Sequence, residues 1–402
     1  MTRTFLQMLT AGGWLALAAA IGPAVAADIS GAGATFPFPI YAKWAEAYKK
    51  ATGVGVNYRS IGSGEGIRQI QDKEVTFGAS DMPLNAADLD LHGLVQFPTV
   101  IGGIAAVVNV EGIRAGDLVL DGPTLARIFL GEIRSWNHSA LRKLNPGAKL
   151  PSQPIVVVRR ADGSGTTFAF TDYLSKISPE WRSRIGSITS IDWPVGVGAG
   201  GNEGVASTVA RTKGAIGYVE YAYAKQNRLA YTTLMNKAGK AVAPTIASFA
   251  AAAANANWDA SPGFGVILTN QAGPETWPIT SATFVLMHKQ PSDPAAASAA
   301  LKFFDWVYAN GGKWRRSLIT FRCRRAWPVR FASCGRRRSR TPAARGSTPP
   351  SNAVGRQASA VIPGRAESAG PESITPVRDY GLRAPSLRSG PGMTRDRSSH
   401  RR

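Results

Sequence analysis

The pattern of hydrophobic and polar positions between residues 28 and 312 alternates between helix-like and strand-like segments. Apolar residues recur at helical spacing over residues 40–50, whereas residues 54–58 show the alternation of a strand. Further helices are expected at residues 66–73, 123–130, 164–174, 249–260 and 294–308, and further strands at 76–79, 100–110, 155–159, 214–219 and 277–288. This order predicts an α/β fold with mainly parallel sheets, and its 285 residues suggest two lobes. The Ala-rich helix at 249–260 is expected to lie on the surface.

The first 27 residues have the three parts of a secretory signal peptide. Arg3 precedes an apolar run over residues 14–21, and small residues follow at 24–27. We expect cleavage after Ala26 or Ala27, and hence export. The alternative is a retained N-terminal anchor, but glycines and Pro23 leave the run shorter than the roughly 20 residues that a spanning helix needs.

The net charge of +21 is concentrated at the C-terminus. Residues 313–402 hold 21 basic and four acidic residues, a net of +17, so residues 1–312 carry only +4. A binding function of the body must therefore depend on individual residues, and nucleic-acid binding is an alternative only for the tail. Cys323 and Cys334 also lie in the tail, so the body has no disulfide or thiolate chemistry.

Residues 313–402 are rich in Arg, Pro, Ser and Gly without a period, which predicts a disordered tail. A shift of reading frame near Lys313 explains its abrupt start. With one base restored, codons for residues 314–324 can be read as Met-Ala-Glu-Lys-Pro-Asp-Tyr-Val-Pro-Met-Pro, which is a far more protein-like sequence. We interpret the tail as an aberrant frameshift product, and resequencing the gene across Lys313 tests this hypothesis.

Three Gly/Ser/Thr-rich turns each follow a strand-like run and precede a helix-like run, at residues 30–37 (SGAGATFP), 61–66 (IGSGEG) and 159–167 (RRADGSGTT). Each can present N–H groups and hydroxyls at a helix N-terminus, where unsatisfied donors and the helix dipole favour an anion. Such turns also cap ordinary helices, so three together predict an anion site without identifying the anion. None has the glycine and lysine spacing of a nucleotide-binding loop. The Gly-rich residues 198–204 are expected to form a loop with little ligand contact.

Several longer strings carry a resemblance to a known family: GAGATFP at 31–37, FGASD at 77–81, QFPTVIGG at 96–103, LNPG at 144–147, VVRRADGSGT at 157–166, GAIGYVEYAYAKQN at 214–227, WPIT at 277–280 and LKFFDW at 301–306. With these strings the chain resembles, from about residue 29 to residue 312, the periplasmic phosphate-binding proteins of the high-affinity phosphate ABC transporter. The resemblance implies a type II periplasmic-binding-protein fold with two lobes joined by a hinge. We expect residues 28–102 and 272–312 in lobe 1 and residues 103–271 in lobe 2.

The resemblance also implies a function and a set of site residues. We expect a periplasmic monomer that captures inorganic phosphate and delivers it to the permease subunits of the transporter at the inner membrane. No catalysis, cofactor, metal or nucleic acid is expected. The phosphate-binding residues carried over are Thr35, Phe36, Ser63, Asp81, Arg160, Ser164, Gly165 and Thr166, and Asp162 is expected to orient Arg160.

These residue types suit a buried anion. The planar fork of Arg160 can bond two oxygens, and neutral N–H and O–H donors make the burial of the charge tolerable. Asp81 discriminates, because an ionised carboxylate only accepts hydrogen bonds and therefore favours a protonated phosphate over sulfate. The blander alternatives are that Asp81 caps a turn and that Arg159 and Arg160 are a solvated pair. Glu65 departs from the family pattern: it is harmless if it points into solvent and weakens binding if it points inward.

The main rival is a secreted phosphatase or phosphotransferase that uses Ser164 or Asp81 as nucleophile. Release of phosphate from a chromogenic ester would support it. The four histidines, His92, His138, His288 and His400, are scattered without metal-ligand spacing, and no Ser-His-Asp set can be assembled. The sequence therefore favours binding over catalysis.

Overall fold

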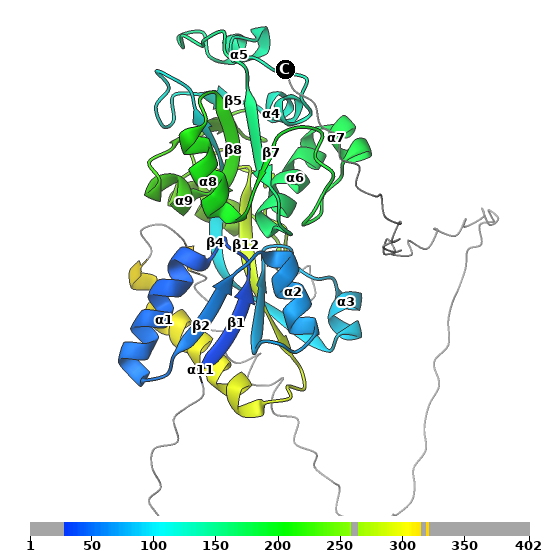
Figure 1. The fold of residues 1–402 in the computed structure, drawn as a ribbon, viewed down its shortest axis with the longest axis vertical. Coiled ribbons are helices and arrows are strands. Elements are labelled where there is room, and N and C mark those ends of the chain that lie inside the picture. The colour runs from blue at the N-terminus through cyan, green and yellow to red at the C-terminus, as the bar shows by residue number, and fades with distance from the viewer. Residues whose placement is uncertain (1–27, 259–263, 315–318, 321–402) are drawn as a thin grey trace, which may run out of the picture. The chain divides into compact units, whose positions relative to one another are not determined.

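The computed structural model describes residues 28–258, 264–314 and 319–320 of the 402-residue chain (Figure 1). The signal peptide predicted at residues 1–27 and nearly all of the tail predicted at 313–402 lie outside the described residues. Within the described part, no helix has the length and apolar character that a membrane span requires.

Strands and helices alternate along most of the chain, as the sequence pattern predicts. The strands are β1 (Ile29–Gly33), β2 (Val56–Ser60), β3 (Phe77–Ser80), β4 (Leu94–Asn109), β5 (Val119–Leu120), β6 (Val156–Arg160), β7 (Val197–Ala199), β8 (Ala215–Glu220), β9 (Ala230–Tyr231), β10 (Thr233–Met235), β11 (Ala241–Val242), β12 (Thr280–His288) and β13 (Ile319–Thr320). The helices are α1 (Phe38–Thr52), α2 (Ser63–Gln71), α3 (Ala86–Leu91), α4 (Gly122–Phe129), α5 (Ser139–Leu144), α6 (Gly165–Ile177), α7 (Pro179–Arg184), α8 (Gly201–Arg211), α9 (Tyr221–Gln226), α10 (Ile246–Ala254) and α11 (Pro294–Asn310), followed by the 3-10 turn η3 (Gly311–Trp314).

The main sheet is mixed, with the strand order β2-β1-β3-β12-β4-β8-β6-β7. Pairs β1–β2, β1–β3, β6–β8 and β6–β7 are parallel, whereas β12 and β4 pair antiparallel with each other and with their neighbours β3 and β8. The α/β fold class is thus confirmed. The sheet departs from the mainly parallel one expected, because two strands run in opposite directions between the lobes.

The 16-residue strand β4 connects the two lobes. Its first part, from Leu94 to Gly103, pairs with β12, and its second part, from Ile104 to Asn109, pairs with β8. The change of partner occurs between Gly103 and Ile104, next to the lobe boundary predicted between residues 102 and 103. Figure 1 shows β4 and β12 running side by side from the lower lobe to the upper one.

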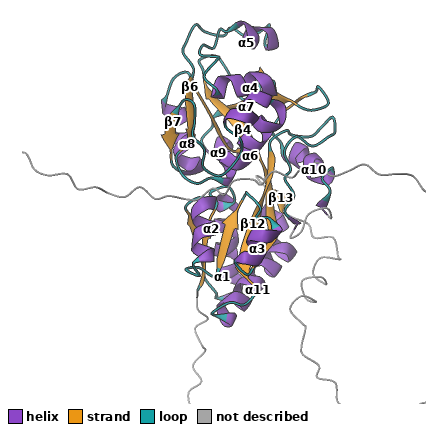
Figure 2. Ribbon diagram, turned by 90° about the vertical axis from the view of Figure 1, so that its right-hand side faces the viewer, coloured by secondary structure: helices purple, strands orange, loops and turns teal. Residues whose placement is uncertain are grey.

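Helices cover both faces of the sheet in each lobe (Figure 2). In lobe 1, α1 and α11 pack together on one face, where the rings of Tyr48 and Phe303 lie 5.2 Å apart, and α2 and α3 cover the other through Ile70 and Leu89. In lobe 2, α6 stacks Phe170 on Tyr218 of β8 at 4.2 Å, and α8 and α9 cover the opposite face. Burial of these apolar faces stabilises the two lobes.

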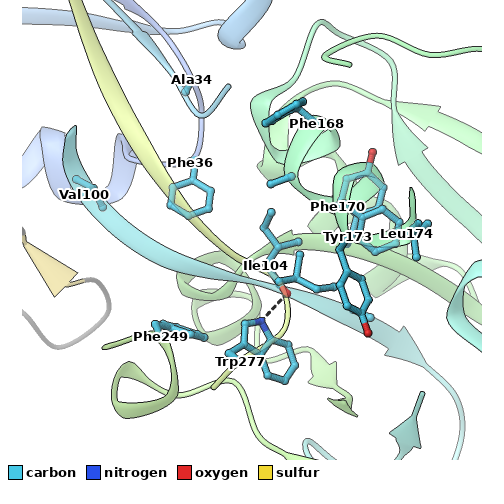
Figure 3. Close-up of a cluster of buried hydrophobic side chains, with 14 of the residues drawn as sticks. Ala34, Phe36, Val100, Ile104, Phe168, Phe170, Tyr173, Leu174, Phe249 and Trp277 are labelled. Carbon is cyan, nitrogen blue, oxygen red and sulfur yellow. Dashed lines mark hydrogen bonds between the residues drawn. The ribbon is translucent and has the colours of Figure 1, made fainter. Parts of the chain in front are cut away.

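The two lobes meet at a junction, and its buried residues come from both lobes (Figure 3). Phe36 follows β1, Ile104 lies on β4 and Phe168 lies on α6. The indole of Trp277 donates to the Ile104 carbonyl at 3.0 Å, which anchors the segment before β12 on β4. Phe36 is fully buried in this cluster, so apolar packing helps to fix the turn that holds it.

Three local expectations are wrong. Helix α10 is not only a surface helix, since Phe249 is fully buried and its ring contacts that of Trp277. Residues 198–204 are not a loop, because β7 extends to Ala199 and α8 begins at Gly201. Ile319 and Thr320 lie in the predicted disordered tail, yet they form β13 and pair with Ile101 and Val100 of β4.

Candidate functional site

The three predicted turns lie at the carboxyl ends of strands β1, β2 and β6, each followed by a helix. The first turn follows Gly33, the second leads into α2 at Ser63, and the third connects Arg160 to α6. Ligands of open α/β sheets bind at this edge, where the strands end and the helices begin. The three predicted turns therefore lie at the edge where ligands of such sheets bind.

Contacts between the second and third turns bring the two lobes together. The Gly64 N–H donates to the Gly163 carbonyl at 2.9 Å. A Cβ atom at Gly165 would lie 2.5 Å from Ser63 Oγ and 2.6 Å from Asp81 Cβ. Only glycine allows α6 to begin this close to lobe 1. Position 165 therefore requires glycine for steric reasons, in addition to the backbone contact with the anion expected from the sequence.

The structure brings all eight predicted phosphate-binding residues into this junction and buries them. None of the seven with side chains is more than 3% exposed, and Gly165 is also buried. The set is Thr35 and Phe36 after β1, Ser63 at the start of α2, Asp81 after β3, Arg160 at the end of β6, and Ser164, Gly165 and Thr166 at the start of α6.

Helix α6 points its N-terminus into the junction. Ser164 is its N-cap and accepts the Thr167 N–H at 3.0 Å, so its own hydroxyl hydrogen is left to donate. Ser63 is the first residue of α2, and its Oγ accepts the Asp81 N–H at 3.2 Å. Two helix N-termini with serine hydroxyls thus supply donors and favourable dipoles for an anion.

Arg160 is held by Asp162, the residue expected to orient it. The Arg160 Nε donates to Asp162 Oδ1 at 2.8 Å, and Nη2 donates to Asp162 Oδ2. Burial raises the pKa of Asp162, but the bonds and charge of Arg160, with the Gly201 N–H, outweigh it and hold that pKa below its usual range. The third guanidinium nitrogen, Nη1, is buried, has no partner in the part of the chain that the structure describes, and can bind a ligand oxygen.

Asp81 has one occupied and one unoccupied oxygen. Oδ1 accepts a hydrogen bond from the Thr283 hydroxyl of β12 at 2.6 Å, whereas Oδ2 is buried and has no partner within residues 28–258 and 264–314. Burial raises the pKa of Asp81 to about 7, although the Thr283 bond and the Arg160 charge act in the opposite direction. A buried acceptor therefore faces the same junction as the unpartnered donor of Arg160.

Glu65 points away from the junction, which resolves the alternatives for this residue. Its carboxylate binds the Arg68 guanidinium at 2.6 Å and accepts from Gln69 Nε2 at 2.8 Å. Hydrogen bonds from Arg68 and Gln69 lower the pKa of Glu65 to about 2. Glu65 is a partly exposed charge in the first turn of α2, where it suits the helix dipole.

Three residues that contact the predicted site were not predicted from sequence: Asn202, Tyr223 and Thr283. Asn202 on α8 donates to the hydroxyl of Thr35 at 2.7 Å, and the Tyr223 hydroxyl donates to the Thr35 carbonyl at 2.6 Å. The sequence signal for Asn202 is an amide in a Gly-rich segment, a pattern that predicts a loop, whereas the structure begins α8 at Gly201.

The described residues show no cluster of His, Cys, Asp and Glu that could hold a metal ion. In the same part of the chain, no hydrogen bond joins a basic side chain to the Ser164 hydroxyl, whose oxygen accepts a backbone N–H. The arrangement can surround an anion with donors and accept one hydrogen bond from it.

Comparisons with known proteins give a consistent result. Residues 18–310 match the family described as PBP superfamily domain. The "Phosphate-binding protein PstS" of Pasteurella multocida is 56% identical over 286 residues, which cover 71% of this chain and 83% of that protein. The protein of the same name from Haemophilus influenzae is 54% identical, over 72% of this chain and 86% of its own length.

Solved structures support the fold. A structure titled as a high affinity periplasmic phosphate-binding protein (PfluDING) bound with phosphate has a TM-score of 0.59 and 22% identity, over 76% of this chain and 93% of its own. A DING protein has a TM-score of 0.60 and 22% identity, over 76% and 94%. These likenesses confirm the two-lobed periplasmic-binding-protein architecture.

Proposed function

Because the chain belongs to the PstS family of phosphate-binding proteins within the PBP superfamily, we propose that it captures inorganic phosphate in the periplasm for an ABC transporter. The permease subunits at the inner membrane are its expected partners, and it acts as a monomer. Export follows from the signal peptide predicted at residues 1–27, with cleavage near Ala26 or Ala27. The lobes comprise residues 28–102 with 272–312, and 103–271.

One observation carries the proposal: a buried donor and a buried acceptor, on two residues of the junction, have no hydrogen-bond partner among the described residues. These are Nη1 of Arg160 and Oδ2 of Asp81. A phosphate with one proton offers an acceptor to the first and a donor to the second, whereas sulfate has nothing to donate. The pairing supports phosphate over other tetrahedral anions of similar size.

The remaining donors complete the shell. In this proposal the hydroxyls of Thr35, Ser63, Ser164 and Thr166 and the N–H groups of Phe36 and Gly165 bind the other oxygens. Asp162 orients Arg160 and neutralises part of its charge, and its ionised state follows from its lowered pKa. Hydrogen bonds to all of its oxygens offset the free energy that the anion loses when it is removed from water.

Calorimetric titration of the purified protein tests the proposal. Phosphate is expected to bind at one site per chain, and sulfate is expected to compete at least 100-fold less well, the effect of about 2.7 kcal/mol of discrimination. Equal binding of the two anions would refute the assigned site. The phosphatase alternative predicts release of phosphate from a chromogenic ester, which the binding proposal does not.

A further inference from the structure

Asn202 contacts site residues of both lobes through a single amide group. It is the second residue of α8 and is fully buried. Its Nδ2 lies 2.7 Å from Thr35 Oγ1, in the turn after β1, and 3.2 Å from Thr166 Oγ1, on α6. One side chain therefore joins the first turn of lobe 1 to the third turn in lobe 2.

The orientation of this amide is fixed by its other end. The backbone N–H of Glu220 donates to Asn202 Oδ1 at 2.8 Å. A backbone N–H can only donate, so the amide oxygen must face Glu220 and the NH₂ group must face the two threonines. Since NH₂ only donates, both threonine hydroxyls are acceptors in these contacts.

The hydroxyl hydrogens must then point elsewhere. Thr35 Oγ1 also accepts the Asn202 backbone N–H at 3.3 Å, so both of its acceptor positions are in use. Within the described residues, no hydrogen bond from either threonine hydroxyl to another protein atom is present, and both side chains are at most 3% exposed. The two O–H groups are left to donate into the junction.

We propose that Asn202 is a positioning residue that makes Thr35 and Thr166 obligatory donors to the bound anion and ties the two lobes together around it. The inference rests on the proposed phosphate site. Without Asn202, each hydroxyl can rotate its hydrogen toward another acceptor and offer a lone pair to the anion, which weakens binding. The Tyr223 hydroxyl, which binds the Thr35 carbonyl, holds the turn but does not set the direction of the hydroxyl.

The control is another buried asparagine in lobe 2. Asn145 is 6% exposed, accepts the Val119 N–H at 2.8 Å and donates to the carbonyls of Val119 and Leu141, neither of which is a predicted site residue. Asn145→Ala and Asn202→Ala should lower the melting temperature similarly. Only Asn202→Ala should change anion affinity.

Phosphate titrations of the full chain and its variants test the proposal. Asn202→Ala is expected to weaken binding about 10- to 100-fold, as two lost donor-setting hydrogen bonds predict. Asn202→Asp keeps the shape, cannot donate when ionised and should weaken binding further. In a Thr35→Val, Thr166→Val background, Asn202→Ala should cost no more than about threefold, because the groups through which it acts are gone.

The outcomes separate the two proposals. A wild-type chain that binds no phosphate overturns the proposed function and this inference with it. A wild-type chain that binds, with Asn202→Ala no weaker than Asn145→Ala, overturns the inference alone. An Asn202→Ala loss that persists in full when both threonines are valine assigns Asn202 a purely structural role and also overturns it.

Discussion

Asp81→Asn is the most direct test of how the site tells phosphate from sulfate. Asp81 is 2% exposed, with Oδ1 bonded to Thr283 and Oδ2 without a partner among the residues that the structure describes. Asparagine keeps the shape, but it replaces an oxygen that only accepts by an amide that can also donate. Sulfate then loses an unfavourable contact, while phosphate can turn an unprotonated oxygen toward the amide. The change should therefore fall mostly on sulfate.

The expected change in selectivity follows from the burial of Asp81 and of the anion that it contacts. A hydrogen bond to a charged group contributes about 1.5–3 kcal/mol, or roughly 10- to 100-fold in affinity. The ratio of the sulfate to the phosphate dissociation constant should fall by this factor in Asp81→Asn. The unpaired charge of Asp81 next to sulfate also raises the selectivity of the wild type. The ratio should therefore fall at least about 10-fold in Asp81→Asn.

The pH dependence gives the same test a second readout. Since the pKa of Asp81 is raised to about 7, the wild-type carboxyl gains a proton as the pH falls below 7 and can then donate to sulfate. Sulfate binding by the wild type should strengthen from pH 8.5 to pH 5, and that of Asp81→Asn should not. Calorimetry at these pH values measures both. An unchanged selectivity ratio, or sulfate binding equally independent of pH in both proteins, would refute the reasoning.

Three further predictions concern other groups of the site. Arg160→Lys should weaken phosphate binding at least about 10-fold by calorimetry, because one ammonium cannot hold Asp162 and the ligand as the guanidinium fork does, and a loss below threefold would contradict this. Gly165→Ala should block closure and weaken binding, since a Cβ there lies 2.5 Å from Ser63 Oγ, whereas Gly147→Ala, with no atom within 4 Å, should bind as the wild type does. Burial raises the pKa of Glu220 well above its usual value, so the folded state binds more protons than the unfolded state and the free energy of unfolding falls as the pH rises above about 4.5. In Glu220→Gln, the free energy of unfolding measured with urea should differ less between pH 5 and pH 8 than it does in the wild type. The same difference in both proteins would contradict this prediction.

Local chemistry explains why the turns could be predicted from the sequence. Ser164 caps α6 within three residues, and Gly165 is needed where that helix begins, so both signals are contiguous in the chain.

The start of β4 was missed because Pro98 argues against a strand. Pro98 is accommodated beside an irregularity in the β12 register between Thr283 and Phe284.

The burial of α10 could not be predicted for a different reason. Its Ala-rich composition is typical of a surface helix, and the residue that makes room for it lies far away in sequence. A Cβ at Gly103 would lie 2.0 Å from the Phe249 ring, so the ring occupies the space that glycine leaves on β4. The composition of α10 shows that Phe249 is apolar, but it cannot show that β4 leaves space for its ring at Gly103.

The selectivity proposed for the site rests on the same kind of long-range contact. Hydroxyls and N–H groups of the three turns favour an anion, but a hydroxyl can donate or accept, and its neighbours decide which. The partners that decide are distant in sequence: Thr283 lies 202 residues from Asp81, and Asn202 lies 167 residues from Thr35. A turn motif can therefore predict the class of ligand, whereas in the proposed site the choice between protonated and unprotonated anions rests on residues that only the folded chain brings together.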